Sequence, residues 1–281
     1  MKVNQLLQIN EEAKENIDSN ESLFPLIKRD CGPFLALNTD LPLYRGMNLN
    51  SGDRSGKKEH RTDRFSRDSA PEFNLLFNAM VQLGAGIPNV RASSIFCAAN
   101  SEQLSVYGHP CYIFPIGDFQ VLWSEEISDS TTHAADIREK VLEELASILE
   151  IPKLRGVASV AIRNMFDFMI DVPGMNIDFF LKPPKDQMHK FLAAANFDGL
   201  MAKHLKSVDG KTLHAALLKA LKNTYKHFYI SGGDSSLKKA LTKKVDEIMI
   251  TKSGGYYYIA TGMPGRVNAD YEHILDQIKA A

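Results

Sequence analysis

The sequence predicts an α+β fold, because segments with the two-residue period of strands stand near both ends of the chain and helical segments lie between them. The period changes at His133, after which apolar residues recur every three or four positions. This order favours one α+β sheet that a C-terminal hairpin closes late, over a chain of independent β-α-β units.

The N-terminal part begins with two short predicted helices within residues 1–31, followed by a strand at 41–47. Residues 48–70 are polar, and they carry basic side chains interspersed with acidic ones. We expect a solvated loop there, which could also cover a bound dinucleotide as a lid. A helix is predicted at 72–83, where apolar residues have helical spacing.

The remaining elements follow from the same two periods. Residues 93–98, 111–114 and 119–123 are expected to be strands, with a turn or helix at 102–107. The helix that begins near His133 stops before Pro152. Further expected elements are helices at 156–170, 185–195, 213–225 and 237–243 and strands at 247–250 and 256–260. The turn at 253–255 (Ser-Gly-Gly) suits a hairpin between the last two strands.

Composition sets broad limits on function. The chain has 281 residues, 44% of them hydrophobic and 24% charged, and its formal net charge of -1 removes any whole-molecule argument for nucleic-acid or anionic-membrane binding. The three cysteines (Cys31, Cys97 and Cys111) lack paired spacing, so buried free thiols in a reducing compartment are expected. No histidine pair has zinc-ligand spacing, so no metal is assigned.

The chain has no stretch near the roughly 20 apolar residues that span a bilayer. We therefore expect a soluble, non-secreted, cytoplasmic protein without a membrane partner.

Three short fragments carry the candidate chemistry. Arg45, placed by a strand, offers a fork of donors for a diphosphate, and Ser93 or Ser94 could hydrogen-bond a ribose. Glu247 precedes an apolar strand and could stabilise positive charge at an anomeric carbon. Each also has a plain structural reading: a salt bridge at a strand end, serines at a strand start and an exposed glutamate. Tyr257 belongs to a three-tyrosine run that could stack a base or pack both faces of a strand.

The order of these fragments resembles the arginine-serine-glutamate class of ADP-ribosyltransferases. The resemblance rests on residues 43–46 (Leu-Tyr-Arg-Gly), 93–96 (Ser-Ser-Ile-Phe) with Tyr107 and Gly108, and 247–250 (Glu-Ile-Met-Ile) with 256–259 (Tyr-Tyr-Tyr-Ile). Residues 112–117 (Tyr-Ile-Phe-Pro-Ile-Gly), with Trp123, Ser124 and Asp129, also resemble proteins encoded by tailed bacteriophages.

The resemblance implies an ADP-ribosyltransferase-like mixed-sheet core with a large helical insertion. Residues 1–130 would form the N-terminal half of the core, 131–241 the mostly helical insertion, and 242–281 a C-terminal hairpin that completes the core.

The resemblance also implies the site and the substrate. The catalytic residues would be Glu247, Ser94 and Arg45, and NAD would be bound by Arg45, Ser93, Tyr107 and Tyr257. No metal would take part, and ADP-ribose would pass from NAD to a protein or nucleic-acid acceptor.

Two functions from other classes remain open. One is a virion structural or interaction protein that keeps the fold without the chemistry, with virion or host proteins as partners. The other is a phage inhibitor of a host defence enzyme that recognises nucleotide signals without turning them over. The protein would then be either virion-associated or free in the host cytoplasm.

Overall fold

The structure is a computed structural model that describes residues 15–16, 20–50, 53–60, 70–150, 181–182, 210–262 and 271–281. The chain divides into two compact units. We call the first, Met1–Arg61, Ser94–Trp123 and Ser231–Ala281, the sheet unit, and the second, Thr62–Ser93 and Ser124–Ile230, the helical unit.

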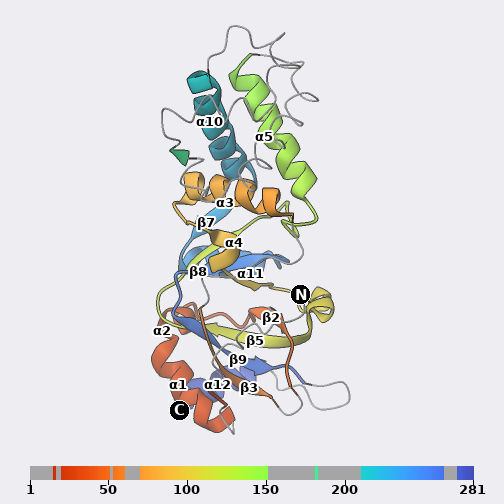
Figure 1. Ribbon diagram of the computed structural model, residues 1–281. Helices are drawn as coiled ribbons and strands as arrows, with labels where there is room; N and C mark the ends of the chain where they lie inside the picture. Colours follow the sequence, from red (N-terminus) through yellow and green to blue (C-terminus); the bar gives the residue numbers. More distant parts are fainter. Residues whose placement is uncertain are drawn as a thin grey trace, which may run out of the picture. The chain divides into compact units, whose positions relative to one another are not determined.

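A five-stranded antiparallel sheet forms one half of the sheet unit (Figure 1). Its strands, in spatial order, are β1 (Glu15–Asn16), β3 (Ser55–Glu59), β9 (Gly255–Ala260), β5 (His109–Pro115) and β2 (Tyr44–Met47). In the register, Arg45 lies opposite Cys111, and Tyr256 lies opposite both Pro115 and Lys58. Because side chains alternate between the two faces of a strand, Arg45, Cys111, Tyr256 and Lys58 share one face.

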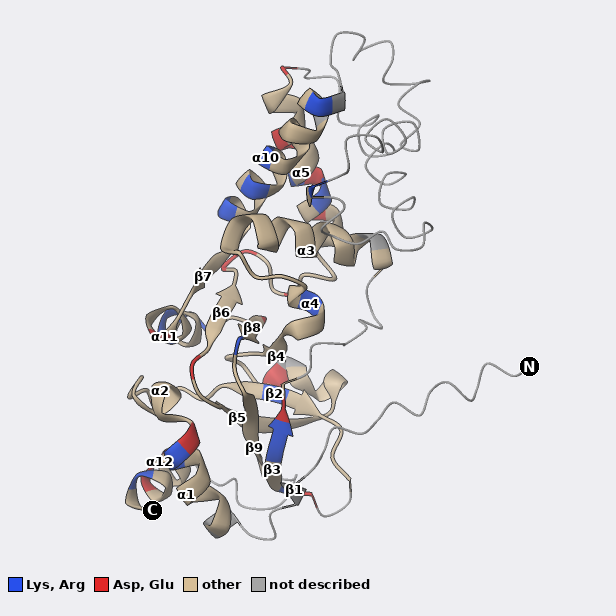
Figure 2. Cartoon of the chain, turned by 60° about the vertical axis from the view of Figure 1, so that its left-hand side comes forward, with Lys and Arg blue, Asp and Glu red and all other residues tan. Residues whose placement is uncertain are grey.

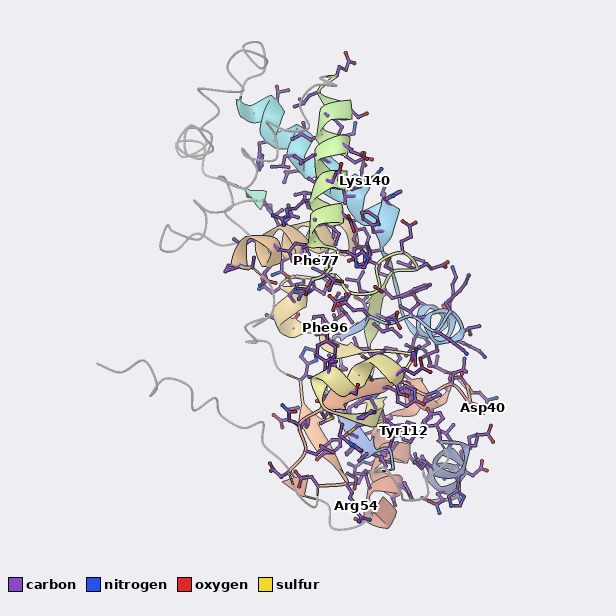
Figure 3. The ribbon with its side chains drawn as sticks, turned by 90° about the vertical axis from the view of Figure 1, so that its right-hand side faces the viewer. Asp40, Arg54, Phe77, Phe96, Tyr112 and Lys140 are labelled. Atoms are coloured by element: carbon purple, nitrogen blue, oxygen red, sulfur yellow. The ribbon has the colours of Figure 1, made fainter. Side chains whose placement is uncertain are left out.

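Three helices cover the opposite face of this sheet: α1 (Asn20–Asp30), α2 (Gly32–Leu35) and α12 (Tyr271–Ala280). The ring of Phe34 on α2 meets that of Phe114 edge-on, with the ring centroids 5.8 Å apart. Tyr271 on α12 lies against Tyr112, which is labelled in Figure 3, with the ring centroids 5.0 Å apart. These aromatic contacts anchor the helices to the sheet.

The second sheet contains β4 (Ile95–Cys97), β8 (Ile248–Thr251), β6 (Gln120–Trp123) and β7 (Ile230–Gly232), in that spatial order. All four residues of β8 are buried, as expected for a strand that lies between two others. Helix α11 (Asp234–Thr242) contacts β6, where Trp123 Nε1 donates a 2.9 Å hydrogen bond to Ser236 Oγ. A short 3₁₀ helix, η2 (Glu102–Tyr107), connects β4 to β5.

Two neighbouring segments of chain pass between the two sheets side by side. Strand β5 leads into β6, and β8 leads into β9, while β5 pairs with β9 and β6 pairs with β8. Between the two sheets, Gly254 N donates to Ile116 O and Ile116 N donates to Gly255 O, each at 3.0 Å. The antiparallel pairing therefore continues through the corner between the sheets.

The helical unit is built around α3 (Pro71–Ala85), α5 (Ala134–Ile148) and α10 (Gly210–Phe228), with the short α4 (Val90–Ser93). Helix α10 contacts both α3 and α5 through a buried apolar face. Phe77 on α3, labelled in Figure 3, meets Tyr229 edge-on with the ring centroids 5.4 Å apart.

The structure confirms the α+β class and most of the predicted elements. The helices expected at 72–83, from His133, at 213–225 and at 237–243 correspond to α3, α5, α10 and α11. The cysteines are free and buried, as expected. The helices expected at 156–170 and 185–195 lie outside the described residues, and no described helix is long and apolar enough to cross a membrane.

Two predictions about the sheets are wrong. The polar stretch 48–70 is not entirely a loop, because Ser55–Glu59 forms β3 between β1 and β9. Its polar residues pair through backbone hydrogen bonds, and the ring of Tyr258 lies across the bare backbone of Gly56. The single mixed sheet is also wrong, because the strands form two antiparallel sheets.

The predicted C-terminal hairpin does not form. Strands β8 and β9 follow one another closely, yet β8 pairs with β4 and β6 while β9 pairs with β3 and β5. Both edges of each strand are therefore occupied by other partners. The intervening turn pairs with Ile116 instead. The predicted insertion at 131–241 overlaps the helical unit, which also includes α3 and α4.

The corner gives a testable prediction about two adjacent glycines. Gly255 has a φ of 133°, and a Cβ there would lie 2.4 Å from Lys58 O, whereas a Cβ at Gly254 would lie 3.5 Å from Ile116 Cγ2, an ordinary contact. Gly255→Ala should lower the free energy of unfolding by about 2–4 kcal/mol through backbone strain and overlap. Gly254→Ala is the matched control and should change it by less than about 1 kcal/mol. Urea denaturation measures both, and equal effects would show that the corner is not constrained as described.

Candidate functional site

Arg45 is the best-defined candidate in the sheet unit. It lies on β2, at the edge of the five-stranded sheet, and its Cζ is 5.4 Å from the ring centroid of Tyr256. This geometry is a cation–π contact. Nη1 of Arg45 is buried and has no hydrogen-bond partner among the residues that the structure describes. A buried charged donor without a partner is unfavourable, so this atom is suited to an acceptor from a ligand.

A second cation lies on the same face of the sheet. Lys58, on β3, is opposite Tyr256, and the lysines of β3 appear in blue in Figure 2. Burial raises the pKa of the Cys111 thiol to about 12, and the positive charges of Lys58 and Arg45 act to lower it. Both cations are therefore close enough to Cys111 to influence the pKa of its thiol. Together Arg45, Lys58, Cys111 and Tyr256 define what we call the Arg45 site.

Glu247 lies near the same end of β4 as Arg45. Tyr44 and Ala98 exchange two backbone hydrogen bonds of 2.8 Å each, which joins β2 to the end of β4. On the other side of β4, Cys97 pairs with Ile248, the residue after Glu247. Two strand spacings thus separate the backbones of Arg45 and Glu247, or about 10 Å.

The two serines do not join this group. Ser94 directly precedes β4 and Glu247 directly precedes β8, and these strands are antiparallel. Their first residues therefore lie at opposite ends of the ladder, with about 13 Å along the strand between Ser94 and the level of Glu247. Ser94 is buried. Ser93 belongs to the helical unit, where its Oγ donates to Asn89 O at 3.0 Å and to Pro88 O at 3.3 Å.

Tyr107 lies beside the backbone of β2. It ends η2, and a Cβ added to Gly46 would be 2.8 Å from the Cβ of Tyr107. Its side chain is 55% exposed, so it can meet a ligand from solvent. Gly46 alternates with Arg45 along β2, so Tyr107 approaches the strand from the face opposite Arg45.

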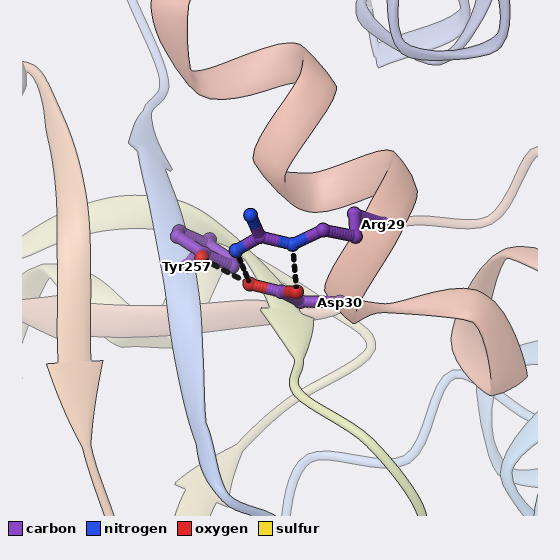
Figure 4. Close-up of polar contacts among 3 residues, drawn as sticks. All are labelled: Arg29, Asp30 and Tyr257. Atoms are coloured by element: carbon purple, nitrogen blue, oxygen red, sulfur yellow. Dashed lines mark hydrogen bonds and ion pairs between the residues drawn. The ribbon is translucent and has the colours of Figure 1, made fainter.

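Tyr257 also lies on the face away from Arg45. Its hydroxyl donates a 2.6 Å hydrogen bond to Asp30 Oδ2, at the end of α1 (Figure 4). Arg29 donates to both oxygens of the same carboxylate, at 2.6 and 2.9 Å. The hydrogen bond from Arg29 is the main cause that lowers the pKa of Asp30 to about 2, and the bond from Tyr257 adds to it, while burial opposes the shift. Tyr257 thus connects β9 to α1.

The sequence did not identify Lys58, Cys111 and Tyr256 as neighbours of Arg45. The sequence could have indicated Tyr256, because it belongs to the same tyrosine run as Tyr257 and alternation places the two side chains on opposite faces. Nothing in the sequence indicated that Lys58 lies on a strand near Arg45, because its segment was expected to be a loop. Across the described ranges, no three histidine, cysteine, aspartate or glutamate side chains gather in a group that could hold a metal ion.

The arrangement places two cations and an aromatic ring on one face of the five-stranded sheet, and the backbone of Glu247 lies about 10 Å from that of Arg45. Arginine and lysine bind phosphate oxygens, and a carboxylate about 10 Å away could accept a hydrogen bond from a sugar hydroxyl. Comparisons of the chain with family models, with curated proteins and with solved structures give no match.

The cluster in Figure 4 predicts a pH-dependent contribution to stability. The pKa of Asp30 is lowered from 3.8 to about 2 in the folded state, so the carboxylate stabilises the fold fully above about pH 4. This contribution should be lost as the pH falls from about 4 to about 2. Asp30→Asn should therefore lower the free energy of unfolding by about 1–2 kcal/mol at neutral pH, and its difference from wild type should shrink toward pH 2.

The measurement is urea denaturation of both proteins between about pH 2 and pH 7. Tyr257→Phe removes one hydrogen bond and leaves the carboxylate and Arg29 in place, so a smaller effect with the same pH trend is expected. A difference between Asp30→Asn and wild type that stays constant over this range would contradict the role given to the carboxylate.

Proposed function

We propose that the sheet unit binds NAD at the Arg45 site and that the protein is an ADP-ribosyltransferase-like enzyme. In this proposal Arg45 and Lys58 contact the diphosphate, and Glu247 contacts the ribose that carries nicotinamide. The backbones of Arg45 and Glu247 are separated by about 10 Å, and an extended dinucleotide is longer than that.

The observation that carries the proposal is that Nη1 of Arg45 is buried and has no hydrogen-bond partner in the described part of the chain. Burying a charged donor without an acceptor costs at least about 1–3 kcal/mol, and a diphosphate oxygen would remove that penalty. The Tyr256 ring supports the guanidinium from one side and limits its orientations. The planar fork of arginine matches the oxygens of a phosphate.

The reaction would break the bond between C1′ of the ribose and the ring nitrogen of nicotinamide, which leaves with the bonding electron pair. A nucleophilic atom of the acceptor would then donate a lone pair to C1′ and lose a proton to solvent or to a base. The carboxylate of Glu247 would stabilise the positive charge that develops on the ribose. The acceptor would be a protein or a nucleic acid.

One observation favours a second function, in which the protein binds the nucleotide without transferring ADP-ribose. The antiparallel pairing of β4 with β8 places Ser94 about 13 Å from the level of Glu247, so a ribose held by Glu247 would be far from the Ser94 hydroxyl. A binding protein needs only the Arg45 site. This function suits the inhibitor and virion interpretations, in which a nucleotide signal is recognised or the fold alone is retained.

Calorimetric titration of NAD tests the binding step. Wild type should bind saturably, and Arg45→Ala should weaken binding by about 10- to 100-fold, the loss of one charge-assisted contact. Arg54→Ala is the matched control, because Arg54 is an exposed arginine of the same unit. Its affinity should stay within about twofold of wild type. Absence of binding at millimolar NAD, or equal losses in both variants, would contradict the Arg45 site.

The release of nicotinamide separates the two functions. Glu247→Gln preserves the size of the side chain and one acceptor oxygen but removes its charge. If the protein is a transferase, this variant should bind NAD and release nicotinamide at least about 100-fold more slowly than wild type. If wild type binds NAD without releasing nicotinamide in the presence of cell-extract proteins and nucleic acids, the binding function is correct and the transferase is not.

A further inference from the structure

Helix α10 carries four lysines and no acidic residue along its 19 positions. At 3.6 residues per turn, Lys211, Lys219, Lys222 and Lys226 fall within an arc of about 80° around the helix. The buried residues of the helix (Ala216, Leu217, Ala220, Leu221, Thr224 and Tyr225) occupy the opposite arc. We call the four residues the lysine stripe, and blue bands mark α10 in Figure 2.

The lysine stripe is available for a ligand. All four side chains are exposed, and none makes an ion pair or a side-chain hydrogen bond with another residue in the part of the chain that the structure describes. Lys140 on the neighbouring α5, labelled in Figure 3, differs in this respect, because its Nζ lies 3.7 Å from Glu143 Oε2 and 3.6 Å from Glu144 Oε1. Among the described residues, the charge on α10 is therefore not neutralised by ion pairs as the charge of Lys140 is.

We propose that the lysine stripe binds the phosphate backbone of a nucleic acid. The stripe extends about 22 Å from Lys211 to Lys226, at a rise of 1.5 Å per residue. Duplex DNA carries one negative charge per about 1.7 Å of its axis, so a straight row of cations of this length can meet several phosphates. The overall net charge of -1 hides this local asymmetry.

The chemistry of the surface favours a nucleic acid over an acidic protein. Protein interfaces have apolar or aromatic residues at their centre. Among the described residues, the large apolar side chains that are exposed (Leu41, Val106 and Tyr107) all belong to the sheet unit. On α10 the residue between the lysines is Ala215, which is exposed and small. Lysines without an apolar centre suit sequence-independent contacts with phosphates.

This inference does not depend on NAD binding, because it concerns a different unit and different residues. The lysine stripe could bind a nucleic acid whether the Arg45 site transfers ADP-ribose, only binds a nucleotide, or does neither.

The test is the binding of a fluorescein-labelled DNA duplex of about 20 base pairs, measured by anisotropy between about 50 and 200 mM salt. Four phosphate contacts predict a slope of log K against log salt near about -3.6, and a loss of about 100-fold in affinity over that range. The variant Lys211→Gln/Lys219→Gln/Lys222→Gln/Lys226→Gln should bind at least about tenfold more weakly at the lowest salt, with a slope near zero. Glutamine keeps a helix propensity close to that of lysine, and circular dichroism verifies the fold.

The matched control replaces four exposed lysines of the sheet unit (Lys243, Lys244, Lys252 and Lys279) by glutamine. This variant has the same net charge as the first and should retain the wild-type affinity and slope. Equal losses in both variants would overturn the proposal, because binding would then follow net charge alone. No binding of the duplex by wild type, or equally tight binding of poly-glutamate at the same salt, would overturn it as well.

Discussion

The structure of the sheet unit depends on the corner where two paired segments of chain pass together from one sheet to the other. Ile116 exchanges hydrogen bonds with Gly254 and Gly255 there, and β5, β6, β8 and β9 are all adjacent to it. Only glycine fits at 255 without strain, because the backbone has a φ of 133° and approaches Lys58 O closely. The corner therefore fixes the register of the central strands of both sheets at once.

The register of β9 decides what each of its tyrosines can do. Tyr257 points to α1, where its hydroxyl meets Asp30. Tyr256 points to the other face, where it supports the Arg45 guanidinium. If the pairing of β9 shifted by one residue, the two tyrosines would exchange faces. Tyr257 would then lie at the Arg45 site, and α1 would lose its hydrogen bond to β9. The candidate site and the packing of the N-terminal helices thus follow from one strand register.

The sequence allowed much of the local structure to be predicted, because apolar periods mark α3, α5, α10 and most strands. It could not reveal β3, whose lysines and glycine have no strand pattern and which depends on the distant β9 for its pairing. The separation of Ser94 from Glu247 follows from the antiparallel pairing of β4 with β8, and strand pairing across some 150 residues leaves no local signal. Arg45 was identified from its position on a strand, whereas its neighbours Lys58 and Cys111 come from strands that only the fold brings together.

In the proposed complex, Arg45 Nη1 donates a hydrogen bond to a phosphate oxygen of a dinucleotide. A crystal structure of the protein with ADP-ribose tests it most directly, because ADP-ribose contains the diphosphate and cannot react as NAD does. We predict a diphosphate oxygen within hydrogen-bond distance, about 2.7–3.2 Å, of Arg45 Nη1, with the guanidinium still against Tyr256. A nucleotide bound elsewhere, with Nη1 paired to a group of the protein itself, would contradict the account.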